Sequence, residues 1–138
     1  MEAKLSMASI QKPYQFIILG APRTKKNSGR IFHNRASGAP ILLPSAASKE
    51  WESKAVWQLM DQWRRKALAG DVGVNAMFYR ERDAGDLVNY MQALADALQV
   101  AKVIEDDRQI VCWDGTRLNK DAARPRVEVQ LTHYGSLK

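Results

Sequence analysis

Carboxylates are concentrated in one part of a chain that is otherwise rich in cations. The aspartates of this part flank or interrupt a short apolar segment, and they are Asp83, Asp86, Asp96, Asp106 and Asp107. Carboxylates repel one another at short range, and such a group persists mainly where a cation lies between its members. Oxygen ligands of this kind suit Mg²⁺, with Mn²⁺ as a second choice. A metal held there would activate water and stabilise the charge of a reacting phosphate, so the pattern predicts phosphodiester hydrolysis.

Each of these aspartates also has an ordinary structural explanation. Asp86, at the start of an expected helix, is a typical N-cap, and Asp83 would favour the positive end of the helix dipole. Asp106 and Asp107 are typical of a turn before a strand. Asp96 could be solvated or paired with a nearby cation. The aspartates by themselves therefore leave a metal site and a set of caps and turns both open.

Cations form a second group that could contact a polyanion. Four of them fall in the loop after the first apolar run, namely Arg23, Lys25, Lys26 and Arg30, and three more flank the acidic stretch, namely Arg80, Arg82 and Arg108. The loop predicts a phosphate-contacting surface, although it also fits a solvated turn. The three flanking arginines could hold a scissile phosphate or form salt bridges with the carboxylates. No base-reading motif is visible, so recognition of DNA shape and backbone is expected.

Composition limits the kind of protein that could carry these groups. The chain has 138 residues and a net charge of +6, which suits a single domain with a polyanionic partner. Cys112 is the only cysteine, which excludes an internal disulfide framework and a cysteine-rich zinc site. No signal peptide or membrane span is apparent, so we expect a cytoplasmic protein without a membrane partner or a small-molecule cofactor.

The apolar pattern predicts the elements that must position these residues. We expect a buried strand at 14–19, a hairpin of strands at 30–34 and 40–44, a helix from Ser45 or Ser48 to near Gly70, a strand at 72–80, a helix at 86–101, and strands at 109–118 and 124–134. Residues 1–13 are expected to be loosely ordered. This order predicts a single α+β domain over residues 1–138, with a mixed β-sheet and two main helices packed on it.

Around its acidic stretch the chain resembles the RusA family of Holliday junction resolvases. The matching elements are GDLVNY, ADAL and VIEDDRQIV, together with the early loop LGAPRTKKNSGRI, the PS before a tryptophan-containing helix, and the final RPRVEVQL. These elements follow the family's order over nearly the whole chain. The resemblance implies a homodimeric α+β nuclease, often encoded by prophages, that uses Mg²⁺ to nick opposed strands of a four-way DNA junction. A symmetric dimer would supply the two active sites from one gene product.

The resemblance also assigns roles to individual residues. Asp86 matches the first catalytic aspartate of the family and Asp107 the last, and Asp106 matches the companion of Asp107. Asn89 and Asp96 match supporting positions on the helix. The acidic residues expected at the active site are therefore Asp86, Asp106 and Asp107, with Asp86 and Asp107 as metal ligands.

Two positions depart from the better-known family pattern, DLDN followed by a helix lysine. Val88 replaces the second aspartate of that pattern and Gln92 replaces the lysine. Our hypothesis is that Asp83 supplies the missing catalytic and metal-binding carboxylate, and that Arg82 or Arg108 replaces the lysine. Two other functions stay open, a branched-DNA-binding protein with weakened cleavage and a non-enzymatic phage protein.

Overall fold

The computed structural model describes residues 12–24, 30–33, 40–43 and 46–135. Its elements are β1 (Tyr14–Leu19), β2 (Arg30–His33), β3 (Pro40–Leu43), α3 (Ala46–Trp63), β4 (Asp71–Arg80), α4 (Leu87–Val100), the 3-10 helix η1 (Asp107–Gln109), β5 (Ile110–Cys112), β6 (Arg117–Lys120) and β7 (Arg126–Gly135). Most of the N-terminal segment expected to be loosely ordered lies outside the described residues. The predicted α+β class, with a mixed sheet and two main helices, is confirmed.

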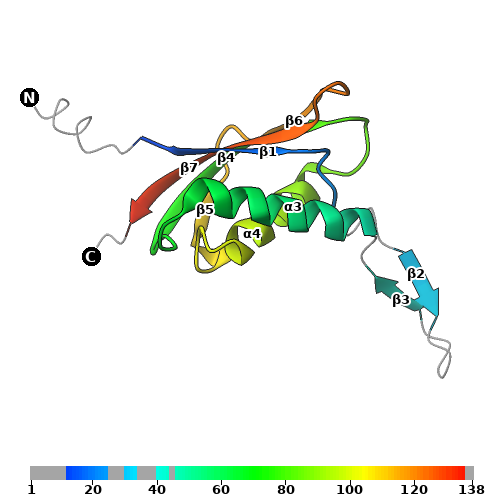
Figure 1. Ribbon diagram of the computed structural model, residues 1–138, viewed down its shortest axis with the longest axis horizontal. Helices are drawn as coiled ribbons and strands as arrows, with labels where there is room; N and C mark the ends of the chain where they lie inside the picture. The colour runs from blue at the N-terminus through cyan, green and yellow to red at the C-terminus, as the bar shows by residue number, and fades with distance from the viewer. Residues whose placement is uncertain (1–11, 25–29, 34–39, 44–45, 136–138) are drawn as a thin grey trace, which may run out of the picture.

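Five strands form the main sheet, and β4 and β7 are its two long central members. β7 pairs antiparallel with β1 on one side and with β4 on the other. The far side of β4 pairs in parallel first with β5 and then with β6, so two short strands share one edge of the sheet. α3 and α4 both lie on one side of this sheet, as Figure 1 shows. The result is a two-layer domain with the helices on a single face.

The core lies between that sheet face and the two helices. On β4 the buried residues Val74, Ala76 and Phe78 alternate with more accessible ones, as expected for a strand with one covered face. α4 contributes Leu94 and Leu98, both fully buried. Burial of a side chain such as Phe78 contributes about 1.5–3 kcal/mol to stability. This core fixes α4 against β4, and the acidic turns lie before and after α4.

The outer edge of β1 is covered by two glutamines of α3. The Gln62 side chain accepts a hydrogen bond from Ile17 N at 3.0 Å and donates one to Ile17 O at 2.8 Å. Gln58 does the same with Leu19, at 2.8 Å and 3.1 Å. Because the two glutamines are four residues apart, they lie on the same helix face and reach alternate residues of the strand. They satisfy backbone groups that an edge strand otherwise leaves unpaired.

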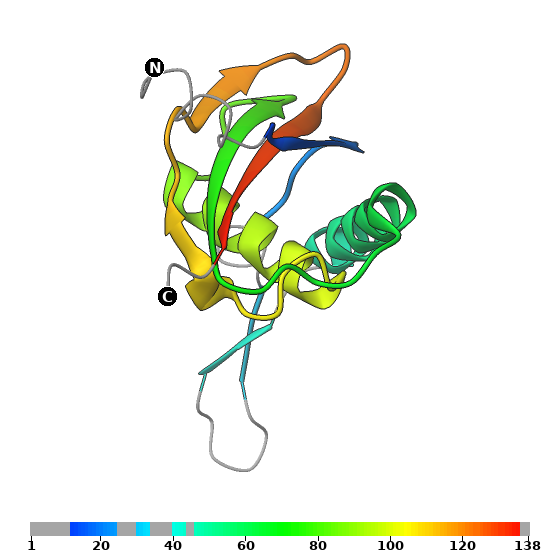
Figure 2. The same ribbon diagram turned by 90° about the vertical axis from the view of Figure 1, so that its left-hand side faces the viewer.

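The hairpin of β2 and β3 is the second sheet. The two strands pair antiparallel, from Arg30 with Leu43 to His33 with Pro40. In both Figure 1 and Figure 2 this hairpin extends away from the main sheet and its helices. The predicted strands are confirmed here, and the turn that was expected between them lies outside the described residues.

Three expectations about single elements were wrong. β1 is not fully buried, because Ile17 and Leu19 face outwards and are 44% and 53% exposed. α3 ends at Trp63 and not near Gly70, since Arg64 adopts a left-handed backbone and Leu68 pairs with Ile104 beyond α4. The single strand expected at 109–118 is interrupted at its middle, which leaves β5 and β6 as separate strands.

A turn at Trp113–Thr116 separates β5 from β6. Thr116 N donates to Trp113 O at 3.2 Å, and Gly115 takes a positive φ of 79°. The Thr116 hydroxyl accepts a hydrogen bond from Ala76 N at 3.0 Å, which satisfies β4 where the ladder is broken. The Asp-Gly pair at 114–115 was the sequence signal for this turn.

Among the described residues, no helix is long and apolar enough to cross a bilayer.

Candidate active site

The first acidic turn connects β4 to α4 and is held by the Arg80 and Tyr90 side chains. The Arg80 guanidinium donates to Ala84 O at 3.2 Å and to Gly85 O at 3.1 Å. The Tyr90 hydroxyl donates to the same Ala84 oxygen at 2.5 Å, and its ring lies 5.6 Å from that of Phe78. The turn is therefore tied to both β4 and α4.

Gly85 is required in this turn for two reasons. Its φ is +81°, a left-handed conformation that residues with a Cβ rarely adopt. A Cβ at this position would also lie 3.0 Å from the Tyr90 ring. The turn therefore reaches Asp86 in one particular geometry that other residues at position 85 would disturb.

Asp86 is the N-cap of α4, as one of the two interpretations of the sequence predicted. Its backbone is extended, with φ −112° and ψ 161°, and its Oδ1 accepts a hydrogen bond from Asn89 N at 3.0 Å. The structure thus assigns Asn89 a backbone contact with Asp86. Asp83 lies three residues earlier, has a side chain that is 77% exposed, and is 3.5 Å from the Arg80 guanidinium.

The second acidic turn follows α4 and contains both Asp106 and Asp107. Asp106 is the N-cap of η1 and accepts from Arg108 N at 2.9 Å. The Arg108 guanidinium donates to its Oδ2 at 3.1 Å, and this hydrogen bond is the main reason that the pKa of Asp106 is lowered to about 2. Asp106 thus works as a cap and an ion-pair partner, and Arg108 forms the salt bridge that was one of its two predicted roles.

Asp107 faces a different environment from its neighbour. Its backbone N–H donates to the Gln99 side chain of α4 at 2.9 Å, which ties the turn to the helix. It contributes to an open hollow of about 180 Å³ between α4 and β5. The other residues of this hollow are Val88, Met91, Gln92, Ala95, Ile110 and Trp113. Asp107 therefore shares a hollow with both positions at which the chain departs from the family pattern.

The structure brings some predicted residues together and separates others. Asp107 and Val88, which lies two residues after Asp86, line the same hollow, whereas Asp96 accepts a hydrogen bond from Gln92 at 2.9 Å. Within the described ranges, no group of three or more His, Cys, Asp or Glu residues is placed to hold a metal. Mg²⁺ usually keeps several waters and takes one or two carboxylates plus substrate phosphates. A Mg²⁺ site therefore needs only one or two carboxylates from the protein.

Three of the predicted cations gather near the first acidic turn. Burial raises the pKa of the Tyr90 hydroxyl, and the positive charges of Arg80, Arg23 and Arg82 oppose that rise, so all three lie close to this ring. Arg23 forms an ion pair with Glu81, the residue that follows β4. Arg82 is exposed. The turn that carries Asp86 is thus surrounded by arginines, two of which already bind protein groups.

The remaining predicted cations are in the early loop. Lys25 and Lys26 lie outside the described residues, and Arg30 is the first residue of β2, whose side chains are likewise not described. The phosphate-contacting role of this loop stays a prediction.

Sequence reasoning missed Gln109, which organises the second turn. Its Oε1 accepts from Glu105 N and Asp106 N at 2.7 Å and 2.8 Å, and its Nε2 donates to Leu68 O and Gly70 O, both at 2.8 Å. Gln109 therefore joins this turn to the segment before β4. An Asp followed three residues later by Gln is a capping-box signal, so the pattern at 106–109 could have identified it.

The fold and site define a small α+β protein with two acidic turns around one helix and arginines beside the first of them. A family model described as Endodeoxyribonuclease RusA matches residues 20–132. The chain belongs to this family, which confirms the resemblance found in the sequence. It is also 27% identical over 77 residues to a protein named crossover junction endodeoxyribonuclease RusA from Aquifex aeolicus (strain VF5). That alignment covers 55% of this chain and 60% of the relative.

Proposed function

We propose that the protein is a Mg²⁺-dependent endonuclease that cuts four-way DNA junctions and related branched DNA in recombination and repair. The observation that carries this proposal is the position of Asp107, which faces α4 across a hollow while Asp86 caps the start of the same helix. Membership of an endodeoxyribonuclease family supports the nuclease activity, and the name of the Aquifex aeolicus relative suggests the junction substrate. A net charge of +6 favours a polyanionic partner.

The described residues support distinct roles in such a reaction. Asp86 and Asp107 would hold Mg²⁺, which, when bound, supplies an activated water and charge stabilisation at the phosphate. Arg82 is exposed beside the first turn and would bind a phosphate oxygen of the substrate. Arg80 holds the turn through Ala84 and Gly85, so its main contribution would be to keep Asp86 in place.

A branched-DNA-binding protein with weakened cleavage is the second candidate. It is favoured by Val88, which is 71% exposed at the hollow that Asp107 lines. A valine cannot bind a metal, and Gln92 carries no charge to stabilise a phosphate. Asp83 remains our candidate for the missing carboxylate, since its exposed side chain is paired only at 3.5 Å with Arg80. Full cleavage by Asp83→Asn would contradict that role.

We further propose that two copies of the chain act together on one junction. Paired nicks require two sites on opposed strands, and a symmetric dimer supplies both. Lys25, Lys26 and Arg30 would extend the DNA contact of each copy by binding backbone phosphates. Light scattering at working concentration tests the dimer, and a monomer that still makes paired nicks would contradict it.

The decisive experiment compares a labelled synthetic four-way junction with the matching linear duplex. Wild type and Asp86→Asn are each incubated with Mg²⁺, Mn²⁺ or EDTA, and nicks are mapped on denaturing gels. We expect symmetric nicks in the junction only, lost in EDTA and in the variant. Junction binding without nicks would favour the weakened binder. A chain that neither binds nor cuts the junction would contradict both candidates and favour a non-enzymatic role.

A further inference from the structure

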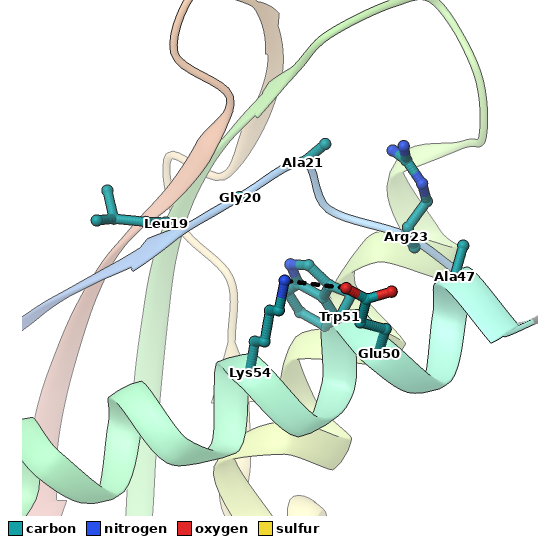
Figure 3. A pocket seen from close by; sticks show the side chains of 8 residues that line it. All are labelled: Leu19, Gly20, Ala21, Arg23, Ala47, Glu50, Trp51 and Lys54. Carbon is teal, nitrogen blue, oxygen red and sulfur yellow. Dashed lines mark ion pairs between the residues drawn. The ribbon is translucent and has the colours of Figure 1, made fainter.

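A second hollow lies between the end of β1 and the first turns of α3, outside the acidic turns. It has a volume of about 200 Å³, and Figure 3 shows the side chains around it. Its polar and charged side chains are Arg23, Glu50, Trp51 and Lys54, and the chain at Gly20 passes over it. None of the roles described so far uses Trp51 or Lys54. The hollow is therefore a separate feature that needs its own explanation.

Trp51 lines this hollow, and its indole carries a buried donor without an acceptor in the described part of the chain. The residue is 5% exposed, and its Nε1 has no hydrogen-bond acceptor among the described residues. In Figure 3 the indole nitrogen is on the edge of the ring nearest the Gly20–Ala21 segment. The other buried tryptophan of α3 differs, because Trp63 Nε1 donates to Lys66 O at 3.1 Å. Buried donors are rarely left unpaired, so an acceptor from outside the described residues is expected at Trp51.

The charges around the hollow indicate what kind of acceptor this would be. Two cations, Arg23 and Lys54, line it together with the carboxylate of Glu50, and Arg23 also pairs with Glu81. The Lys54 ammonium is 2.9 Å from Glu50 Oε1, but both side chains are about two thirds exposed. An exposed pair of this kind is weak, so Lys54 can turn to another anion at small cost.

Arg23 connects this hollow to the first acidic turn. It lines the hollow and forms an ion pair with Glu81, the first residue of the segment that leads to Asp86. Its charge also acts on the buried Tyr90 hydroxyl beside that turn. A linear ligand that carries many negative groups could therefore contact the hollow and the first acidic turn at the same time. DNA, with a phosphate at every nucleotide, is such a chain.

We propose that this hollow binds one backbone phosphate of the DNA substrate, with Trp51 Nε1–H and the Lys54 ammonium as donors. The identity of the ligand as DNA rests on the proposed function, whereas its chemistry, an anion rich in acceptor oxygens, follows from the donors. The site holds a phosphate other than the one that is cut, so it sets the position of the strand and not the chemistry. Loss of this contact weakens DNA binding while the cleavage rate of bound DNA is kept.

The first test measures junction affinity by fluorescence anisotropy in EDTA, where no cleavage interferes. Trp51→Phe keeps most of the ring volume and removes the donor, and we expect about tenfold weaker binding, as for the loss of a hydrogen bond to a charged group. Lys54→Gln should weaken binding and lower the slope of log affinity against log salt by about one. Trp63→Phe is the matched control, since it makes the same change at a donor that already has an acceptor.

The second test titrates the wild-type protein and uses a variant only to assign one signal. The four indole N–H signals are followed by NMR during titration with inorganic phosphate and, separately, with the uncut junction in EDTA. We expect the Trp51 signal, identified by its absence in Trp51→Phe, to shift with both. A shift with inorganic phosphate alone, together with unchanged junction affinity of both variants, would overturn the assignment to DNA. No shift with either ligand would overturn the site itself.

The tests of the phosphate site can fail independently of the proposed nuclease function. If wild type nicks the junction in Mg²⁺ and both Trp51→Phe and Lys54→Gln bind it with wild-type affinity, the phosphate site is contradicted and the nuclease function is supported. If wild type neither nicks nor binds the junction, the nuclease function is contradicted. The phosphate titration would still show whether the hollow binds an anion.

Discussion

The two acidic turns that bracket α4 use their aspartates in different ways. In the turn before α4, Asp86 is the helix cap, and Asp83 is largely exposed. In the turn after α4, two adjacent aspartates divide the tasks. Asp106 caps η1 and holds an ion pair, while Asp107 faces the hollow against α4. A pair of neighbouring carboxylates thus separates a structural role from a potential chemical role, whereas Asp86 would have to serve in both.

This difference has a consequence for substitutions in the two turns. A change at Asp107 should affect chemistry first, because Asp106 and not Asp107 caps η1 and forms the ion pair with Arg108. A change at Asp86 should affect both chemistry and stability unless the new side chain can still cap the helix. A change at Asp106 or its partner should affect stability first.

The largest expected effect is the loss of cleavage in Asp107→Asn. If Asp107 binds the metal, we expect a rate lower by about 100-fold or more, since even outer-shell partners of a metal contribute about 10–100-fold. The midpoint of urea unfolding should stay unchanged. Single-turnover nicking of the junction and urea denaturation measure the two quantities. A variant that cleaves at the wild-type rate would show that Asp107 is not part of the site.

A gain of activity is expected from Val88→Asp. The substitution adds a carboxylate to the hollow that Asp107 lines, at an exposed position where it disturbs no core contact. We expect tighter Mg²⁺ binding and a cleavage rate higher by about tenfold, the lower end of the effect of a metal-site group. The rate is measured against Mg²⁺ concentration. Val88→Asn is the control, and an equal gain in that variant would indicate a polarity effect without metal binding.

Changing Asp86 to Asn and to Ala should distinguish its role in cleavage from its role as a helix cap. Both variants lose the carboxylate, so both should lose cleavage. Asn still caps a helix, whereas Ala removes the bond to Asn89 N and should lower the free energy of unfolding by about 1 kcal/mol. Thermal and urea unfolding of the two variants give this difference. Equal stabilities would mean that the cap observed here contributes little to folding.

The smallest expected effect is a change in acid stability in Arg108→Ala. The pKa of Asp106 is lowered from 3.8 to about 2, chiefly by its hydrogen bond to the Arg108 side chain. A lowered folded-state pKa stabilises the protein above pH 3.8, and this contribution is lost as the pH falls through about 2. The variant should be less stable at pH 6 and approach wild type near pH 2. Urea unfolding from pH 6 to 2 checks this, and parallel curves would contradict it.

The covered edge of β1 is an example of what local patterns do not contain. Gln58 and Gln62 are ordinary polar residues of a helix surface, and nothing in their spacing indicates hydrogen bonds to Ile17 and Leu19. These contacts arise only because α3 packs beside β1 in three dimensions. The same is true of Trp51, whose unpaired donor is visible only once its surroundings are known.

The sequence by itself determined the class of fold, most element positions and the family. Apolar alternation and helical periodicity are local properties, so β1, β4 and α4 could be placed from them with small errors at their ends. Capping is local as well, and Asp86 was expected at the start of α4. The family match over residues 20–132 agrees with the motifs that were read from the chain.

Tertiary structure alone decided what each of these acidic residues contacts. Asp106 and Asp107 are adjacent and chemically identical, yet η1 makes Asp106 its cap, and only Asp107 lines the hollow beside α4. Packing also decided that Arg80 holds a turn and that α3 stops at Trp63. The physical reason is that such contacts join residues far apart in the chain, where the partner of a side chain depends on the whole fold and not on its neighbours in sequence.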